Sequence, residues 1–293
     1  MGYAAYSPVT TTEDGSAHVE LAEDHPGVSD PAYRARRDEL ASLAAGWKPG
    51  DPVPVPGYSD EEHEVWRIVS SELEILHEKY ASEAFLEGKD ALELPSDHIP
   101  HLDEVSAELE PLVDFRYQPV AGLAPVRDFY GSFAQGVFWS TQYLRHPSVP
   151  LYTPEPDIIH EVIGHANQIA DPAFAHMYRL VGEAVNRTKS EEALRFLSQV
   201  FWFTMEFGVV EEDGDLRAYG AGILSSVGET KSFQEATVRP VDLVEMGTVD
   251  YDITHYQPLL YGFSSPAELE EVLTDFFGRF DDNVHDEMLK KAS

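Results

Sequence analysis

The stretch YTPEPDIIHEVIGHAN, residues 152–167, places His160 and His165 five positions apart on a segment that is otherwise typical of a helix. On an ideal helix with about 3.6 residues per turn, a spacing of five turns the second side chain by roughly 140° from the first. A spacing of four would bring both side chains to one face. The two imidazoles can therefore share an ion if the helix widens by one residue, or if they reach toward each other from different turns.

A third candidate ligand is Glu206, in FWFTMEFG (residues 201–208), where a carboxylate interrupts a run of aromatic and apolar side chains. Burying a carboxylate without a partner is costly, so the pattern predicts a bound cation or an ion pair with an arginine. Two imidazoles and one carboxylate suit non-haem iron(II) and leave coordination positions open. Zinc is the alternative metal, but the zinc hydrolase motif spaces its histidines four apart, so HEVIGH has one residue too many.

The composition narrows the possible chemistry. The 293 residues include no cysteine, so disulfides, thiolate metal sites and thiol nucleophiles are excluded. The 53 acidic and 20 basic residues give a formal net charge of −33, which disfavours nucleic acid and anionic membranes as partners. No apolar run approaches the roughly 18 residues of a membrane-spanning helix, and the first residues do not resemble a secretory signal, so we expect a cytoplasmic location. The excess of acidic residues is explained either by adaptation to a salt-rich cytoplasm, where high ionic strength screens the repulsion between them, or by the protein being an ordinary soluble acidic protein.

The hydrophobic pattern predicts a mainly α-helical protein with a few short β-strands, built as one domain. Residues 1–28 are polar and lack periodicity, which predicts a flexible N-terminal arm, and residues 29–293 form the predicted domain of packed helices. Short strands are expected over 216–219 and around Ile223. Capping residues and apolar spacing predict helices over 31–46, 59–88, 101–109, 127–146, 171–187, 190–210 and 264–290.

Several stretches, taken in order, resemble the pterin-dependent aromatic amino acid hydroxylases, and most closely the members that act on phenylalanine. The resemblance is carried by DHPGVSDPAYRARR, YQPVAGL, RDF, STQYLRH, YTPEPDIIHEVIGH, FWFTMEFG, AYGAGILSS and YQPLLY, which together cover roughly residues 24–280. It implies the family's catalytic domain alone, with iron and a pterin bound, and without the regulatory domain or assembly helix of its eukaryotic members. We therefore expect a monomer.

The resemblance also implies roles for individual residues at positions that match the family's motifs. Arg145 would grip the substrate carboxylate with its forked guanidinium, and Phe129 would stack on the pterin. Glu161 would then serve the pterin and would not act as a hydrolytic base. The full set comprises His160, His165 and Glu206 as catalytic iron ligands; Arg145, Thr153, Trp202, Ser225 and Ile253 as substrate contacts; and Leu123, Phe129 and Glu161 as pterin contacts.

The implied activity is a monooxygenation, in which O2, iron(II) and a tetrahydropterin such as tetrahydrobiopterin hydroxylate the ring of L-phenylalanine to give tyrosine. Ile253 favours phenylalanine because relatives that take tyrosine carry an acid there, and Trp202 disfavours tryptophan. Trp139, Phe201 and residues 124–126 depart from the family pattern, so hydroxylation at the meta position or of another aromatic amino acid stays an alternative. A zinc-dependent hydrolase and a non-catalytic binding protein are the rival functions.

Overall fold

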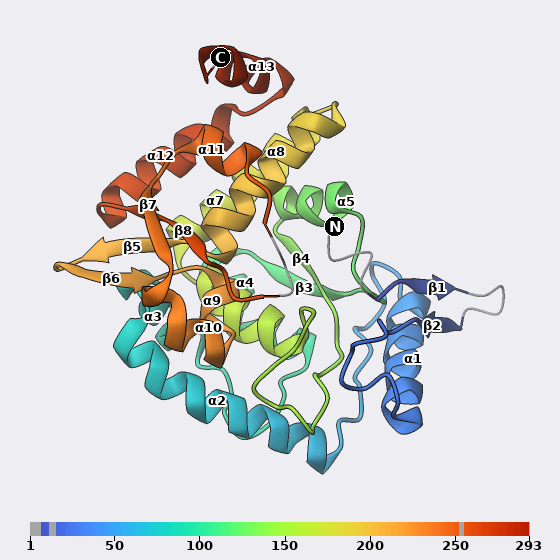
Figure 1. Ribbon diagram of the computed structural model, residues 1–293. Helices are drawn as coiled ribbons and strands as arrows, with labels where there is room; N and C mark the ends of the chain where they lie inside the picture. Colours follow the sequence, from blue (N-terminus) through green and yellow to red (C-terminus); the bar gives the residue numbers. More distant parts are fainter. Residues whose placement is uncertain (1–6, 12–15, 252–254, 293) are drawn as a thin grey trace.

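The computed structural model describes residues 7–11, 16–251 and 255–292. Helices predominate, as the hydrophobic pattern predicted, and short strands form small sheets at the edges of the helical body (Figure 1). Among the described residues, no helix is both long enough and apolar enough to cross a bilayer.

The helices have the following bounds: α1 Pro31–Gly46, α2 Asp60–Tyr80, α3 Glu83–Leu92, α4 Leu102–Val113, α5 Val126–Ser132, α6 Asn167–Ile169, α7 Pro172–Arg187, α8 Glu191–Phe201, α9 Ala221–Leu224, α10 Val227–Ser232, α11 Leu243–Thr248, α12 Pro266–Arg279 and α13 Asp282–Ala292. The described residues also form short helical segments: the 3₁₀ turns η2 Phe133–Gln135 and η5 Phe233–Glu235, and the π-helical segments η3 His160–Ala166 and η4 Trp202–Glu206.

The first two helices begin where their capping residues predict. Asp30 accepts hydrogen bonds from the backbone N–H groups of Ala32 and Tyr33 at the start of α1, and a proline follows it directly. At the start of α2, Ser59 and Glu62 form a reciprocal capping box. These local signals suffice because a helix start depends on residues only three positions apart.

Some predicted helices are shorter than expected. The helix predicted over 59–88 is divided between α2 and α3, because Ala81 is extended and Ser82 caps the second helix. The helix predicted over 264–290 is likewise divided into α12 and α13.

The helix predicted over 127–146 is wrong beyond its first turns. After α5 and η2, Gly136 adopts a left-handed conformation with φ +64° and turns the chain into β4 (Val137–Ser140). Ile223 also lies in a helix, α9, so the strand expected there is wrong, whereas the other expected strand is present as β6 (Asp215–Ala218).

The described part of residues 1–28 is folded and does not form the loose arm that was predicted. Strands β1 (Val9–Thr11) and β2 (Ala17–Val19) pair in an antiparallel hairpin beside α1 (Figure 1). Alternate residues Ala17, Val19 and Leu21 are buried against this helix, a period-of-two pattern too short to stand out in the sequence. The predicted domain boundary at residue 29 therefore does not coincide with the start of ordered packing.

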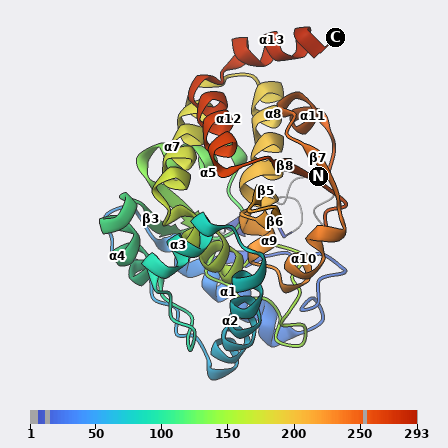
Figure 2. The same cartoon turned by 90° about the vertical axis from the view of Figure 1, so that its left-hand side faces the viewer.

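Two further sheets flank the helical core. Strand β3 (Arg116–Pro119) pairs in parallel with β4. The larger sheet has the order β6-β5-β8-β7, with β5 at Val209–Glu212, β7 at Thr237–Pro240 and β8 at Leu259–Phe263. Figure 2 shows α7, α8 and α12 standing together above this sheet, with α13 beyond them at the C-terminal end.

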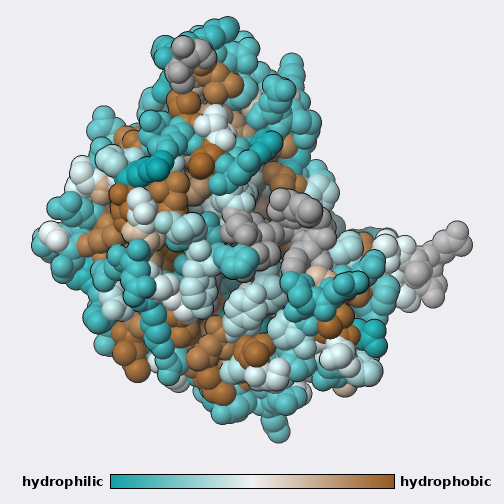
Figure 3. Space-filling model, in the orientation of Figure 1, coloured by the Kyte–Doolittle hydropathy of each residue, from teal (hydrophilic) through white to brown (hydrophobic). Residues whose placement is uncertain are grey.

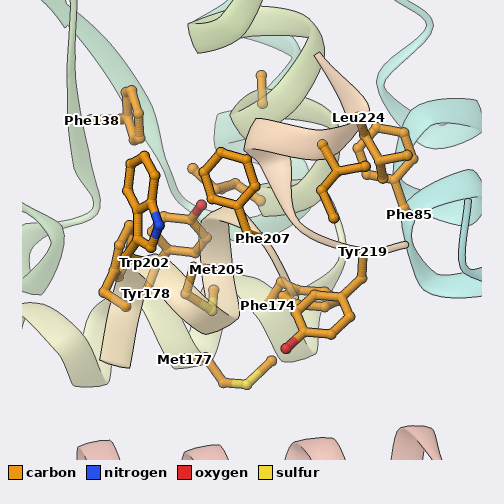
Figure 4. Close-up of a cluster of buried hydrophobic side chains, with 14 of the residues drawn as sticks. Phe85, Phe138, Phe174, Met177, Tyr178, Trp202, Met205, Phe207, Tyr219 and Leu224 are labelled. Atoms are coloured by element: carbon orange, nitrogen blue, oxygen red, sulfur yellow. The ribbon is translucent and has the colours of Figure 1, made fainter. Parts of the chain in front are cut away.

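The π-helical segments lie inside the hydrophobic core. Trp202, Met205 and Phe207 from η4 and the residue after it belong to the same cluster of buried side chains as Met177 and Tyr178 of α7 (Figure 4). The core therefore encloses the segments that carry the three predicted ligands.

At the surface, hydrophilic residues predominate around scattered hydrophobic ones on the face shown in Figure 3, in keeping with the net charge of −33.

Candidate metal centre and its two cavities

The helix that carries the two histidines widens where they require it. From His160 to Ala166 the chain is π-helical, so backbone hydrogen bonds span five residues and side chains five apart come to lie near one face. The Nε2 atoms of His160 and His165 are 3.0 Å apart. The structure thus confirms that the helix widens by one residue, the first of the two predicted ways for the pair to converge.

Glu206 joins the two histidines from a second π-helical segment, η4. Its carboxylate oxygens lie 3.3 Å from the Nε2 atom of His165 and 3.7 Å from that of His160. All three ligand atoms are within 4.8 Å of one another. Burial raises the pKa of Glu206, but the two nearby imidazoles outweigh burial and lower it below its ordinary value, so the group is a carboxylate ready to bind a cation.

A chain of hydrogen bonds sets the tautomer of His165. The side-chain amide of Gln168 donates to the carbonyl oxygens of Met205, at 3.1 Å, and Tyr219, at 2.8 Å, so its Oε1 atom is free to accept. Burial raises the pKa of Tyr178 well above its ordinary value, and its hydroxyl donates to this Oε1 atom at 2.5 Å. The Tyr178 oxygen therefore accepts from Nδ1 of His165, at 2.6 Å, which leaves the Nε2 lone pair for a metal.

His160 is held in a similar way by one hydroxyl. Its Nδ1 atom is 2.9 Å from Oγ of Ser225, which follows α9. Burial lowers the pKa of His160 to about 4, so the ring is neutral near pH 7 and its other nitrogen can bind a metal. The close packing behind it depends on Gly164, because a Cβ there would lie 2.7 Å from the carbonyl oxygen of Ala221.

A first cavity reaches one of the three ligands, His160, and is lined by three of the predicted substrate contacts, Arg145, Thr153 and Ser225. Arg145 is buried and forms a two-pronged ion pair with Asp157, with Nε–Oδ2 and Nη2–Oδ1 distances of 2.8 Å and 2.9 Å. This pair fixes the orientation of the guanidinium within the cavity wall. The lining residues are Arg145, Tyr152, Thr153, Pro154, Glu155, Pro156, His160, Phe207, Gly222, Ser225, Ser226, Glu229, His255, Tyr256 and Gln257.

A second cavity is lined by all three ligands and by the predicted pterin contacts Leu123, Phe129 and Glu161. Burial raises the pKa of Glu161 well above its ordinary value, and the carboxylates of Glu206 and Asp157 raise it further. The lining residues are Val120, Gly122, Leu123, Ala124, Val126, Phe129, Tyr130, Trp139, Thr141, Pro156, His160, Glu161, His165, Ser198, Trp202, Glu206 and Tyr251.

Trp202 lies between the two cavities. It was predicted to bind substrate, yet it lines the second cavity, stacked on Tyr251 with ring centroids 4.3 Å apart. The ring centroids of Trp202 and Phe207 are 4.5 Å apart, and Phe207 lines the first cavity. These two rings thus form part of the wall between the cavities. The remaining predicted contact, Ile253, lies outside the described residues.

Several functional neighbours were missed in the sequence. Asp157, the partner of Arg145, stands three residues before His160 within the quoted stretch, so its position was a usable signal. Tyr178 and Gln168 carried no such signal, because a tyrosine and a glutamine on helices are commonplace. Of the two residues that depart from the family pattern, Trp139 lines the second cavity, and Phe201 is buried with its ring centroid 4.6 Å from that of Tyr130.

Comparisons with known proteins agree with this site. The family model for biopterin-dependent aromatic amino acid hydroxylase matches residues 10–285. The phenylalanine 3-hydroxylase of Streptomyces coeruleorubidus is 44% identical over 259 residues, which cover 88% of this chain and 93% of that enzyme. The phenylalanine-4-hydroxylase of Dictyostelium discoideum is 41% identical over 267 residues, which cover 89% of this chain and 60% of that enzyme. The chain thus spans less than two thirds of the second relative.

Solved structures show the same fold. A structure of phenylalanine hydroxylase from Chromobacterium violaceum with bound oxidised Fe(III) has a TM-score of 0.77 at 26% identity, over 87% of this chain and 94% of that one. Another structure of that enzyme, with iron(III) and 7,8-dihydrobiopterin, has a TM-score of 0.72 at 29% identity, over 78% of this chain and 84% of that one. The donor set formed by His160, His165 and Glu206 fits the iron that both of those structures contain.

Proposed function

Because the chain belongs to the biopterin-dependent aromatic amino acid hydroxylase family, we propose that its substrate is L-phenylalanine, whose ring it hydroxylates. Family membership makes the protein an iron- and pterin-dependent monooxygenase of aromatic amino acids, with iron held by His160, His165 and Glu206. It also excludes the zinc-dependent hydrolase and the non-catalytic protein considered as rivals. The choice of phenylalanine follows the names of the relatives, most of which act on that amino acid.

The observation that supports this proposal most directly is that one metal ligand lines both cavities. His160 lines both cavities, with Arg145 on one side and Phe129 on the other. A substrate carboxylate bound by Arg145 would place the amino acid in the cavity that reaches His160. A pterin beside Phe129 and Glu161 would occupy the other cavity, so both reactants would lie next to one iron.

The chain's own groups would position the reactants and exclude water. When bound, iron and the pterin supply the activation of O2 that delivers one oxygen atom to the ring. Arg145 would hold the carboxylate in a fixed direction because Asp157 restrains its guanidinium. Glu161, whose raised pKa favours the protonated form, could donate or accept a hydrogen bond at the pterin. The buried rings of Trp202 and Phe207 would keep solvent from the reacting atoms.

The proposed product is tyrosine, formed by hydroxylation at the para carbon. A second candidate is hydroxylation at the meta carbon, because the Streptomyces relative, matched over 93% of its length, is a phenylalanine 3-hydroxylase. The two outcomes differ only in which ring carbon faces the metal. Residues of the wall between the cavities, Trp202 and Phe207, are placed to decide this orientation.

Product analysis tests the proposal. The protein is incubated aerobically with iron(II), a tetrahydropterin and each of L-phenylalanine, L-tyrosine and L-tryptophan in turn, and the amino acid products are separated against authentic para-, meta- and ortho-tyrosine. We expect para-tyrosine from phenylalanine, formed only when iron and the pterin are both present. A predominantly meta product would support the second candidate. Faster hydroxylation of tyrosine or tryptophan would contradict the proposed substrate.

Three coarser features are proposed alongside the substrate. We propose that residues 29–293 contain the whole iron- and pterin-binding unit, that the protein acts as a monomer, and that it works in the cytoplasm. The location of all three iron ligands within this range supports the first point. Sedimentation velocity tests the second, since a dimer or tetramer would contradict it, and localisation of a tagged full-length chain tests the third.

A further inference from the structure

The first cavity contains a buried carboxylate that the preceding account does not use. Glu229 lies in the first turn of α10, is 7% exposed, and lines the cavity together with Arg145 and Ser225. Its Oε1 atom accepts a hydrogen bond from the backbone N–H of Gln257 at 3.1 Å. Within the described residues, no ion pair joins Glu229 to a lysine, an arginine or a histidine. A carboxylate this deeply buried is costly to leave without a cation.

The other acids around this cavity are already paired. Glu155 lies 2.6 Å from Nη1 of Arg37 and 3.4 Å from Nε2 of His25, so two basic groups face it. Asp157 is engaged by Arg145 through both of its oxygens. Glu229 therefore differs from its neighbours, because its carboxylate has no basic partner in the described part of the chain and its side chain lines an open cavity.

We propose that Glu229 binds the α-ammonium group of the amino acid substrate, in the same cavity in which Arg145 binds the substrate carboxylate. This inference rests on the proposed function. An α-amino acid carries both charges on substituents of one carbon, so a site that binds the zwitterion needs a base and an acid lining one cavity. The ammonium group supplies the cation that the buried carboxylate lacks, through a charge-assisted hydrogen bond.

This arrangement makes Glu229 a specificity residue. A carboxylic acid that lacks the amine forms no ion pair with Glu229, and its own negative charge is repelled by the Glu229 carboxylate. The site therefore binds such an acid less tightly than the amino acid. Burial raises the pKa of Glu229 to about 7, which means that capture of the ammonium group should improve as pH rises through that value. The other titratable groups that line the cavity are Arg145, Tyr152, Glu155, His160, His255 and Tyr256.

The test compares two ligands in one variant. Glu229→Gln keeps the shape and the acceptor for Gln257 but removes the charge. The probes are L-phenylalanine and 3-phenylpropanoate, which is phenylalanine without its amine. In the variant we expect the KM and the calorimetric Kd for L-phenylalanine to rise by about 10- to 100-fold with little change in kcat. The inhibition constant of 3-phenylpropanoate should stay the same or fall, since repulsion is removed.

A matched control and the pH profile separate binding from folding. Glu235→Gln makes the same change at an exposed position and should leave both ligands unaffected. In the wild type, kcat/KM for L-phenylalanine should rise as the pH is raised through about 7. In Glu229→Gln this pH-dependent increase should be absent. The inference is overturned if the variant binds L-phenylalanine as the wild type does, or if both ligands weaken in parallel. A wild type that never hydroxylates phenylalanine would instead overturn the proposed function, and the Kd comparison would still report on Glu229.

Discussion

The two cavities that meet at His160 are built from different chemistry. The first is lined by Arg145, which is paired with the buried Asp157, and by the carboxylate of Glu229, so its polar wall is charged. The second is lined mainly by apolar and aromatic side chains, among them Phe129 and Trp202. A charged wall selects a ligand by the position of its charges, whereas an aromatic wall accepts a flat ring. The contrast matches a zwitterionic amino acid on one side and a planar pterin on the other.

The largest expected effect comes from removing Glu206, a metal ligand beside His160, which is the ligand that lines both cavities. Glu206→Ala deletes the only carboxylate among the three ligands, so we expect iron content to fall and hydroxylation to drop by more than about 100-fold. Metal analysis and single-time-point product assays measure both quantities. Binding of L-phenylalanine at Arg145 should largely survive. An active variant with normal iron content would show that the ligand assignment is wrong.

The next effect is confined to the first cavity. Arg145→Lys keeps the positive charge but loses the two-pronged geometry and one of the bonds to Asp157, so the KM for L-phenylalanine should rise by about 10- to 100-fold. The KM for the tetrahydropterin should stay within about twofold, because Arg145 does not line the second cavity. Steady-state kinetics with each reactant varied in turn measures the two constants. If the KM values for L-phenylalanine and for the tetrahydropterin rose in parallel, the inference that the two reactants bind in separate cavities would be contradicted.

A smaller effect is expected on the aromatic side. Phe129→Leu keeps an apolar side chain in the second cavity but removes the ring, which should raise the KM for the tetrahydropterin by about 3- to 10-fold. The KM for L-phenylalanine should not change. Tyr130→Phe is a control on the neighbouring position that keeps the ring and should leave both constants near their wild-type values. An unchanged pterin KM in Phe129→Leu would contradict the predicted stacking.

The smallest effect concerns stability alone. The pKa of Glu229 is about 7 in the folded protein and near 4.5 when unfolded, so the folded state binds the proton more tightly. Its stabilising contribution is complete below about pH 4.5 and is lost as pH rises through 7. Glu229→Gln should therefore raise the free energy of unfolding relative to the wild type by about 1–3 kcal/mol at pH 8 and very little at pH 4.5. Urea unfolding at the two pH values measures the difference, and an equal effect at both would contradict it.

Part of the fold was predictable from short stretches of sequence. The starts of α1 and α2 follow from Asp30 and Ser59, because a cap acts on N–H groups two or three residues away. The break at Ala81 and the turn at Gly136 were missed, since apolar spacing continues across both. The hairpin before α1 was missed because its strands have three residues each, too few for a period of two to be recognised.

The site shows the same division between local and distant information. His160, His165 and Glu206 were predicted from their chemistry together with the family resemblance, and they do converge. The sequence contains no direct sign that Tyr178 and Gln168 support His165, because this chain of hydrogen bonds joins α7, α6 and backbone carbonyls from two further segments. Glu229 escaped notice because nothing along the chain reveals that it is buried in a cavity.

The amino acid sequence by itself determined the helical class, the absence of thiol chemistry and the residue types available to bind iron. Only the tertiary structure decided which cavity each residue lines and which of the described acids lie beside a basic group. Periodicity and capping depend on neighbours a few positions away, whereas burial and charge pairing depend on segments such as η3 and α10 that meet only after folding. The cost of burying a charge acts on that final arrangement, which is why the role of Glu229 could be inferred only there.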